Sequence, residues 1–393
     1  MKEKKTAIDL FCGCGGISEG LKRLGFNVLA GVDSEKKYIS TFTHNFPESN
    51  SLIVDLRDFS PERLMEVAGI EKGELTLLAG GPPCQGFSKN VPRKYRFLED
   101  RNNLLIKIFL DYCEALKPTM ILMENVAEMK NGFQQSYTEE ILERLNYVGY
   151  EVTNVVLNAA NYGIPQRRRR AFFLANKLGI KFSKPQETHS KLCSQPKIIH
   201  DLNHVSVWEA IGDLPSLNHG EGNDITDYSC NPFSDYQDTV RQGCKNVSNH
   251  VARKLQPTQY ARYKALKPGE GHKDLPIDLQ VKSGYSGAYG RLTKLMIAPT
   301  ITRWVFHPGS GRWGHPVDIR SLTIREVARI QGFPDSYEFV GTYNNMAGQL
   351  GNAVPPLLIE TIVKAMCDQL EVSNESINSK NCSKEILSSA LGS

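Results

Sequence analysis

Residues 6–16 read TAIDLFCGCGG, in which a short apolar run passes directly into a cluster of glycines. Apolar side chains then recur at helical spacing over residues 18–24. Because glycine lets a backbone turn sharply and approach a ligand closely, the stretch predicts a strand, a tight turn that faces a ligand, and a helix. Asp33 follows Gly13 by 20 residues, at the end of the next apolar run, where nucleotide-binding sheets place an acid for ribose hydroxyls.

The same alternation of short apolar runs and helical patterns extends over the first 176 residues. Helical spacing is clear again at residues 103–116. Such alternation predicts an α/β fold, a doubly wound and mostly parallel sheet with helices on both faces. We expect its strands at residues 6–11, 26–32, 51–54, 75–79, 120–123, 152–157 and 171–175.

The glycine spacing limits the ligand that the first turn can bind. It is Gly-x-Gly-Gly rather than the Gly-x-Gly-x-x-Gly of dinucleotide-binding sheets, and no P-loop lysine follows. NAD and ATP are therefore disfavoured, whereas a ligand with adenosine and no pyrophosphate, such as S-adenosylmethionine, suits Asp33 and Asp55 at the ends of the second and third predicted strands. The alternative is a strand-to-helix turn that binds nothing.

A second informative stretch, residues 79–88, reads AGGPPCQGFS and follows the apolar run 75–78. Two consecutive prolines make a stiff turn, and the carboxyl ends of strands are where open α/β sheets bind ligands. The turn is expected to present the thiol of Cys84, and the basic segment 89–101 after it offers positive charge that favours the reactive thiolate. The alternative is an inert, packed cysteine, the commoner state of this residue.

Composition describes an ordinary globular protein of 393 residues, with 40% hydrophobic and 23% charged residues. The net charge is only +4, but basic residues gather in 89–101, 167–170 and 241–267, which favours an anionic partner. None of the nine cysteines forms a Cys-x-x-Cys pair, so we expect no metal site and a reducing cytosol. Without an apolar leader or a membrane-length apolar run, a cytoplasmic location is expected.

The pattern changes to polar, Gly- and Pro-rich sequence near residue 184, which predicts two domains. We expect a catalytic and cofactor-binding domain over 1–184, completed by 345–372, and a second, smaller, irregular domain over 185–344. Within the second domain, Thr323 and Glu326 form the signature of a capping box before a short helix. Residues 357–370 predict another helix, and the Ser- and Asn-rich segment 373–393 predicts a disordered tail.

Taken together, these motifs resemble those of the DNA (cytosine-5)-methyltransferases of bacterial type, in the family's order and over nearly the whole chain. The resemblance implies a Rossmann-like, S-adenosylmethionine-dependent methyltransferase domain, which releases S-adenosylhomocysteine, and a target-recognition domain. Arg320 to Pro334 resembles the segment that organises that domain, and residues 349–356 the last cofactor motif. The implied cofactor-binding residues are Asp9, Phe11, Gly13, Gly15, Gly16, Asp33, Asp55, Pro82, Asn352 and Val354.

The resemblance also implies four catalytic residues, Cys84, Glu124, Arg168 and Arg170. Cytosine C5 becomes nucleophilic only after a thiolate adds at C6, a step assigned to Cys84. The addition moves charge toward N3, where Glu124 is expected to donate a hydrogen bond, with arginines 168 and 170 holding O2, a phosphate or Glu124 itself. From the residues alone, Glu124 could equally be a surface or salt-bridged acid and residues 167–170 a solvated charge run.

The implied partner is double-stranded DNA, from which the target base is flipped into the pocket. We expect a monomer, possible pairing with a restriction endonuclease, and DNA contacts from Gln85, Ser88, Lys89, Arg93, Arg291 and Arg303. Two alternatives are an RNA cytosine C5 methyltransferase of the same fold and a catalytically silent DNA-binding homologue. The Cys-Phe-Thr signature common in the RNA branch is absent, and the intact Cys84, Glu124 and Arg168 argue against a silent protein.

Overall fold

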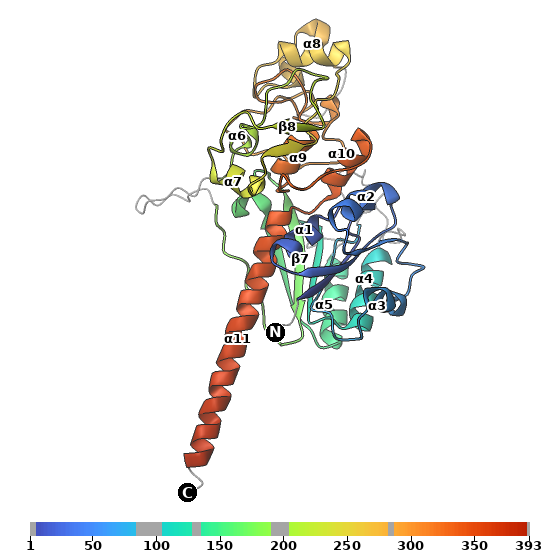
Figure 1. Ribbon diagram of the computed structural model, residues 1–393, viewed down its shortest axis with the longest axis vertical. Helices are drawn as coiled ribbons and strands as arrows, with labels where there is room; N and C mark the ends of the chain where they lie inside the picture. Colours follow the sequence, from blue (N-terminus) through green and yellow to red (C-terminus); the bar gives the residue numbers. More distant parts are fainter. Residues whose placement is uncertain (1–4, 84–103, 128–134, 190–203, 282–286, 391–393) are drawn as a thin grey trace.

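A computed structural model describes residues 5–83, 104–127, 135–189, 204–281 and 287–390 of the chain. Figure 1 shows an α/β domain in the lower part of the molecule, a smaller domain of loops and short helices above it, and a long helix that descends past the sheet. The predicted fold class is confirmed. The two domains meet at the carboxyl ends of the central strands, where the site described below lies.

The lower domain is built on a seven-stranded sheet in the order β3-β2-β1-β4-β5-β7-β6. Its first five strands run parallel, whereas β7 is antiparallel to both β5 and β6. The strands are β1 (Thr6–Leu10), β2 (Asn27–Asp33), β3 (Asn50–Ile53), β4 (Leu77–Gly80), β5 (Met120–Val126), β6 (Glu151–Asn158) and β7 (Arg169–Asn176).

Successive residues of the central strands pack into two different hydrophobic cores, because side chains alternate between the faces of a sheet. On β1, Ala7 belongs to one core and Ile8 and Leu10 to the other. Both faces are buried, as expected for parallel strands that read as continuous apolar runs. The covering helices are α1 (Gly16–Arg23), α2 (Lys36–Asn45), α3 (Pro61–Ala68), α4 (Leu104–Leu116), α5 (Gln135–Tyr147) and the 3-10 turn η5 (Ala159–Tyr162).

The upper domain contains short elements joined by long loops. The only described strands in it, β8 (Ile225–Asp227) and β9 (Asn246–Ser248), form a two-stranded ribbon. The helices are α6 (Val207–Ile211), α7 (Asp235–Arg241), α8 (Pro257–Ala265), α9 (Ile324–Ile330) and α10 (Tyr343–Asn352), with 3-10 turns η6 (His272–Asp274), η7 (Ile277–Leu279) and η8 (Pro308–Ser310).

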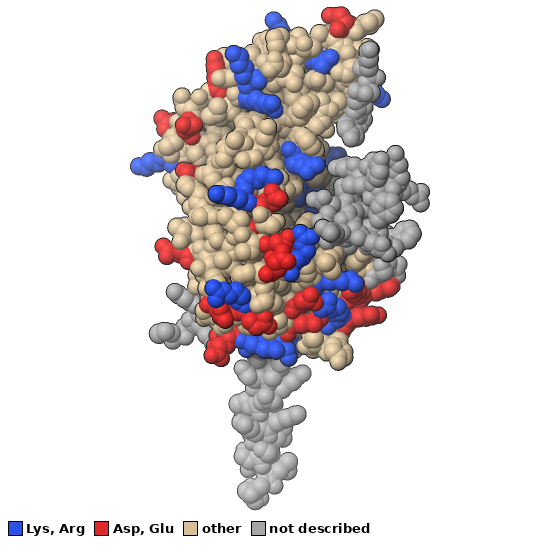
Figure 2. All heavy atoms as spheres, turned by 90° about the vertical axis from the view of Figure 1, so that its right-hand side faces the viewer, with Lys and Arg blue, Asp and Glu red and all other residues tan. Residues whose placement is uncertain are grey.

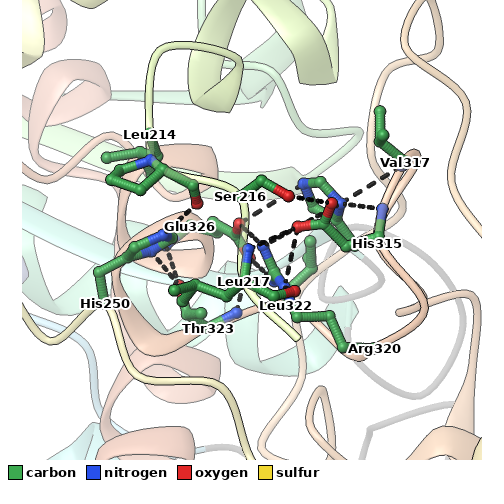
Figure 3. Close-up of polar contacts among 12 residues, drawn as sticks. Leu214, Ser216, Leu217, His250, His315, Val317, Arg320, Leu322, Thr323 and Glu326 are labelled. Carbon is green, nitrogen blue, oxygen red and sulfur yellow. Dashed lines mark hydrogen bonds and ion pairs between the residues drawn. The ribbon is translucent and has the colours of Figure 1, made fainter. Parts of the chain in front are cut away.

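A buried network of charges organises this domain around the start of α9 (Figure 3). The predicted capping box is confirmed, since Thr323 accepts from the Glu326 amide and Glu326 accepts from the Thr323 amide. Arg320 donates to both carboxylate oxygens of Glu326 at 2.8 Å, in the two-point geometry that makes such pairs strong. His315 lies 3.5 Å from Glu326 and 3.5 Å from Asp318. The side chains of His315, Asp318, Arg320 and Glu326 therefore hold the surrounding loops together without a regular sheet.

The chain ends in α11 (Pro356–Ala390), whose first part packs against α1 in the lower domain. This corrects the expected tail, because the helix continues to Ala390 instead of ending near residue 370. Beyond Leu370 it runs away from the body of the molecule (Figure 1). The stretch Tyr343–Ser373 is long and apolar enough in length and composition to cross a membrane, but 56% of its apolar window is buried inside the protein, so core packing accounts for its hydropathy.

Candidate active site

One cavity of about 520 Å³ lies at the carboxyl ends of β1, β2, β4 and β5, where parallel sheets bind their ligands. Eight of the predicted cofactor-binding residues and three of the predicted catalytic residues line it together. They are Phe11, Gly13, Gly16, Asp33, Asp55, Pro82, Asn352 and Val354, with Glu124, Arg168 and Arg170. Residues more than 340 positions apart in the chain therefore share one chamber.

The turn after β1 follows the path that its glycines predict. Gly13 has a φ of +54°, and a Cβ built on it would meet no atom within 4 Å, so its backbone faces open space in the cavity. At Gly16 a Cβ would lie 2.3 Å from the carbonyl oxygen of Val354. Only glycine lets the start of α1 approach the segment after α10 this closely, and that contact closes the cavity wall.

Asp9 and Gly15 lie behind the cavity rather than in its lining. Asp9 is fully buried, and its Oδ2 accepts from the Ser18 hydroxyl at 2.6 Å and the Ser18 amide at 3.2 Å. Burial raises the pKa of Asp9 to about 7. A Cβ on Gly15 would lie 2.6 Å from the hydroxyl of Tyr337, which donates to the Cys14 carbonyl. Both residues shape the turn from behind the cavity lining.

Asp33 occupies the predicted place at the end of β2, yet both of its carboxylate oxygens accept hydrogen bonds from backbone amides. Oδ2 accepts from the Gly13 amide at 2.9 Å and Oδ1 from the Glu35 amide at 2.8 Å, while burial raises its pKa. Asp33 thus ties the glycine turn to the second strand. Glu35, which sequence reasoning missed, is exposed and lines the same cavity. Its position two residues past the strand was the available signal.

Asp55 also lines the cavity, as predicted from its place after β3. Its carboxylate forms an ion pair with Arg57, and this hydrogen bond lowers the pKa of Asp55. The Asp55 carboxylate therefore stays ionised near neutral pH and can accept a hydrogen bond from a ligand's amino group. Tyr38, on α2, is a further lining residue that sequence reasoning did not select.

At the other end of the cavity, Glu124 on β5 meets Arg170 on β7. Arg170 Nε lies 2.9 Å from Glu124 Oε1, and both side chains are largely buried. A Cβ on Gly81 would lie 3.3 Å from Glu124 Oε2, so the turn after β4 passes directly beside this carboxylate. Asn125, also missed as a site residue, donates from Nδ2 to the Pro82 carbonyl at 3.2 Å and fixes the turn to β5.

The residues after Pro83 fall outside the part of the chain that the structure describes. The predicted nucleophile Cys84 and the predicted DNA contacts Gln85, Ser88, Lys89 and Arg93 are among them. Their roles remain predictions, but the turn that leads to Cys84 is placed. It ends beside Glu124, inside the lining of the same cavity.

Side chains of the arginine segment alternate as they do along a strand, since 168 and 170 line the cavity whereas 167 and 169 are exposed. Arg168 is only 2% exposed, and its Nη1 donates to the Ile301 carbonyl at 3.1 Å. Its Nε has no partner among the described residues. Burial, with a smaller effect of neighbouring Arg170, lowers the pKa of Arg168. An anionic or carbonyl-bearing ligand would relieve this cost.

The two arginines predicted to read DNA in the upper domain differ in placement. Arg303 is exposed, lies 5.1 Å over the ring of Trp304, and has its backbone against Gly351 of the cavity lining. Arg291 is only 6% exposed, and its guanidinium donates to backbone carbonyls of Leu266, His315, Val317 and Asp318. The structure therefore makes Arg291 a framework residue, not an exposed DNA contact.

Surface charge differs between the domains on the face shown in Figure 2. Lys and Arg side chains are scattered over the upper domain with few acids among them, whereas the lower domain carries both signs densely. A phosphate backbone is attracted to surfaces where positive charge is uncompensated. The upper domain meets that condition on this face.

Comparison with known proteins relates the whole chain to one family. A family model for the C-5 cytosine-specific DNA methylases matches residues 5–368. The chain is 32% identical over 395 residues to the Type II methyltransferase M.DdeI of Desulfomicrobium norvegicum, covering 96% of this chain and 91% of that protein. It is 33% identical over 364 residues to the Type II methyltransferase M1.HphI of Haemophilus parahaemolyticus, covering 92% and 86%.

A solved structure is similar over the same extent. It is a crystal structure described as a DNA modification methyltransferase encoded within a prophage (E. coli), with a TM-score of 0.74 and 25% sequence identity. The similarity covers 93% of this chain and 99% of that one. Both the lower sheet and the upper domain are thus part of the shared architecture.

Proposed function

The chain belongs to the family of C-5 cytosine-specific DNA methylases, and on this premise we propose that it transfers a methyl group from S-adenosylmethionine to C5 of a cytosine flipped out of double-stranded DNA. One observation carries the proposal. A single cavity joins the glycine turn and its acids to the Glu124–Arg170 pair and to the turn that leads to Cys84.

The cavity suits a nucleoside that carries no phosphate. Its lining offers the aromatic ring of Phe11, the carboxylates of Glu35 and Asp55, and open backbone at Gly13, without a lysine placed to bind phosphate among the described lining residues. Glu35 would accept from ribose hydroxyls and Asp55 from an adenine amino group. When bound there, S-adenosylmethionine supplies a methyl group on a positively charged sulfur, open to attack by a carbon nucleophile.

Cys84 starts the reaction that we propose. Its thiolate adds to C6 of the cytosine, forming a sulfur–carbon bond and moving an electron pair toward C5 and N3. Once C5 carries the methyl group, its proton leaves and the sulfur–carbon bond breaks, which restores both the aromatic ring and the thiolate. No described residue is assigned as the base that takes this proton.

Glu124 and Arg170 act on the charge that develops during addition. Glu124 in its protonated form would donate to N3 and stabilise the electron-rich ring. Arg170 orients the Glu124 side chain, since its Nε lies 2.9 Å from Oε1. Arg168 is buried, and its Nε has no partner among the described residues, so it would donate to the cytosine O2 or to a DNA phosphate.

The upper domain would choose the DNA sequence, with Arg303 and Trp304 exposed next to the cavity lining. Because C5 is hidden within a stacked duplex, the target base has to flip out of the DNA helix to reach the cavity. We further propose that the protein acts as a monomer in the bacterial cytosol and is paired with a restriction endonuclease, as the Type II designation of its relatives suggests.

Bisulfite sequencing of plasmid DNA from cells that express the protein tests the function directly. We expect protected cytosines at one recurring sequence, and none in cells that express the Cys84→Ala variant. If the purified protein also methylates a duplex carrying that sequence only when S-adenosylmethionine is present, the cofactor is established. Unprotected cytosines throughout, despite folded protein in the cells, would contradict the proposal.

A further inference from the structure

Ile301, in the upper domain, is held at both of its backbone groups by side chains of the lower domain. Gln166 Oε1 accepts from the Ile301 amide at 2.8 Å, and Arg168 Nη1 donates to the Ile301 carbonyl at 3.1 Å. The backbones also pair here, since Arg167 donates to the Ala298 carbonyl at 2.9 Å. The arginine segment of the active site is therefore attached directly to the upper domain.

The other end of the Gln166 amide continues the connection. Its Nε2 donates to Oε1 of Gln331, at the end of α9. Gln331 Nε2 in turn donates to the carbonyls of Leu350 at 3.0 Å and Ala353 at 2.7 Å. Ala353 lines the cofactor end of the cavity and precedes Val354, whose carbonyl lies against Gly16. The hydrogen bonds thus run unbroken from the upper domain to the cofactor wall.

Both glutamines are completely buried, and each amide can face only one way. An amide has an acceptor end and a donor end, so turning either side chain around would set donor against donor or acceptor against acceptor. In a buried position such a mismatch is costly. A shift of the Ala353 wall can therefore be met only by a matching shift at Ile301 and Arg168, or by breaking a buried hydrogen bond.

We propose that Gln166 and Gln331 are positioning residues that couple the cofactor wall to Arg168 and to the DNA-reading domain. The proposal rests on the proposed function. Occupation of the cofactor end would fix the Ala353 wall and, through the two amides, the Ile301 contact and the guanidinium of Arg168. By thermodynamic reciprocity, DNA would tighten cofactor binding by the same factor by which cofactor tightens DNA binding.

The test measures this factor for the wild-type chain and for Gln166→Met and Gln331→Met, with S-adenosylhomocysteine and a duplex carrying the methylated sequence as probes. Dissociation constants for each probe are determined alone and with the other probe saturating. We expect wild-type tightening on the order of 5- to 150-fold and less than about 2-fold in either variant. Cofactor KM should rise in both variants more than kcat falls.

A matched control separates coupling from lost stability. Gln237 is equally buried, but among the described residues its side chain bonds only within the upper domain, to the Phe233 amide and the Trp208 carbonyl. Gln237→Met should lower thermal stability comparably and keep wild-type coupling. Gln331→Glu, which keeps the shape and removes both donated hydrogen bonds, serves if the Met variants do not fold.

Three results would overturn the proposal. They are a wild-type protein without coupling, variants at 166 and 331 that retain it, and a Gln237→Met variant that loses it equally. These results differ from failure of the proposed function, because wild-type methylation of the same duplex is measured independently. A chain that methylates DNA without coupling refutes only the positioning role.

Discussion

At the scale of single residues, the site depends on a carboxylate whose surroundings are now defined. Glu124 lies between Arg170 and the turn after β4, where the proposed mechanism requires a proton donor to the pyrimidine ring. We predict that Glu124→Ala lowers kcat by roughly 10²- to 10⁴-fold, the usual contribution of a positioned general acid. The rate of methylation of a duplex substrate in a single turnover measures this loss. Binding of that duplex should change little.

An ordinary glutamate–arginine pair provides the control for that measurement. Glu66 pairs with Arg63 on α3, with both side chains mostly exposed. Exposed pairs contribute little, so Glu66→Ala should leave the rate within about twofold of the wild type. Equal rates for Glu124→Ala and Glu66→Ala would remove Glu124 from the mechanism.

The thiol of Cys84 makes a second prediction. Incubation with a duplex that contains 5-fluorocytosine and with S-adenosylmethionine should trap a covalent adduct, because fluorine cannot leave C5 as the proton does. Peptide mass spectrometry should locate it at Cys84, and Cys84→Ala should form none while still binding DNA and cofactor. Cys230, an exposed thiol in the upper domain, is the control. An adduct that persists in Cys84→Ala would contradict the assignment.

Sequence predicted single site residues best where the backbone decides their position. Gly13 and Gly16 follow directly from a strand that ends in a glycine turn, whereas Glu124 was indicated by the family resemblance, and all three line the cavity. Sequence did not predict the role of residues whose position is decided by tertiary contacts. Arg291 looks like a DNA contact in sequence, yet four carbonyls from distant loops surround its guanidinium. No local sequence pattern indicates that these loops converge on the Arg291 guanidinium.

At the scale of elements, α9 shows the same division. Its capping box is a local signal and was predictable, whereas the buried Arg320 that pairs with Glu326 is not. The α11 helix past residue 370 was missed because serine and asparagine are weak helix formers. The second domain could be predicted only as irregular, since its buried apolar residues lie on short elements and loops without a clear period, and no local pattern indicates its buried ion pairs.

The network around α9 predicts acid sensitivity. His315 accepts at Nδ1 from the Asp318 amide, and burial, opposed in part by Glu326 and Asp318 and aided by Arg320, lowers the pKa of its ring to about 4. The pKa of a histidine in an unfolded chain is about 6.5, so between pH 6.5 and 4 the unfolded chain binds a proton at this residue and the folded chain does not. Stability from this residue is therefore present above pH 6.5 and lost as pH falls toward 4.

The expected loss between pH 7 and 5 is about 2 kcal/mol of unfolding free energy. Glu326 adds to it at lower pH, because Arg320 and His315 outweigh burial and depress its pKa below the unfolded value. Urea unfolding at both pH values measures the change. His315→Gln, already less stable at pH 7, should lose less stability on acidification than the wild type. An equal pH response in His315→Gln would refute the assignment.

At the scale of the whole molecule, function depends on segments that return from far along the chain. The sheet supplies the cavity floor, Ile301 of the upper domain accepts a hydrogen bond from Arg168 of the cavity lining, and Val354 closes the cavity wall just before α11 begins. The fold class was predictable because strand and helix alternate along the sequence. No local pattern predicts the closure, because it depends on contacts between residues separated by hundreds of positions; only the resemblance of residues 349–356 to a cofactor motif indicated it.

The two parts of α11 should therefore differ in importance. Up to Leu370 its apolar side chains are buried, with Ile359 and Ile362 packed in the core that also contains Leu21 of α1. Past that point the helix leaves the body of the molecule (Figure 1).

Removing residues 374–393 should shift the thermal midpoint by less than about 2 °C and leave methylation unchanged. Ile359→Asp, which buries a charge, should lower the midpoint by many degrees or prevent folding. If instead the truncated chain folds normally but loses DNA binding or turnover, the distal helix takes part in the reaction, and the predicted independence of the site from it is wrong.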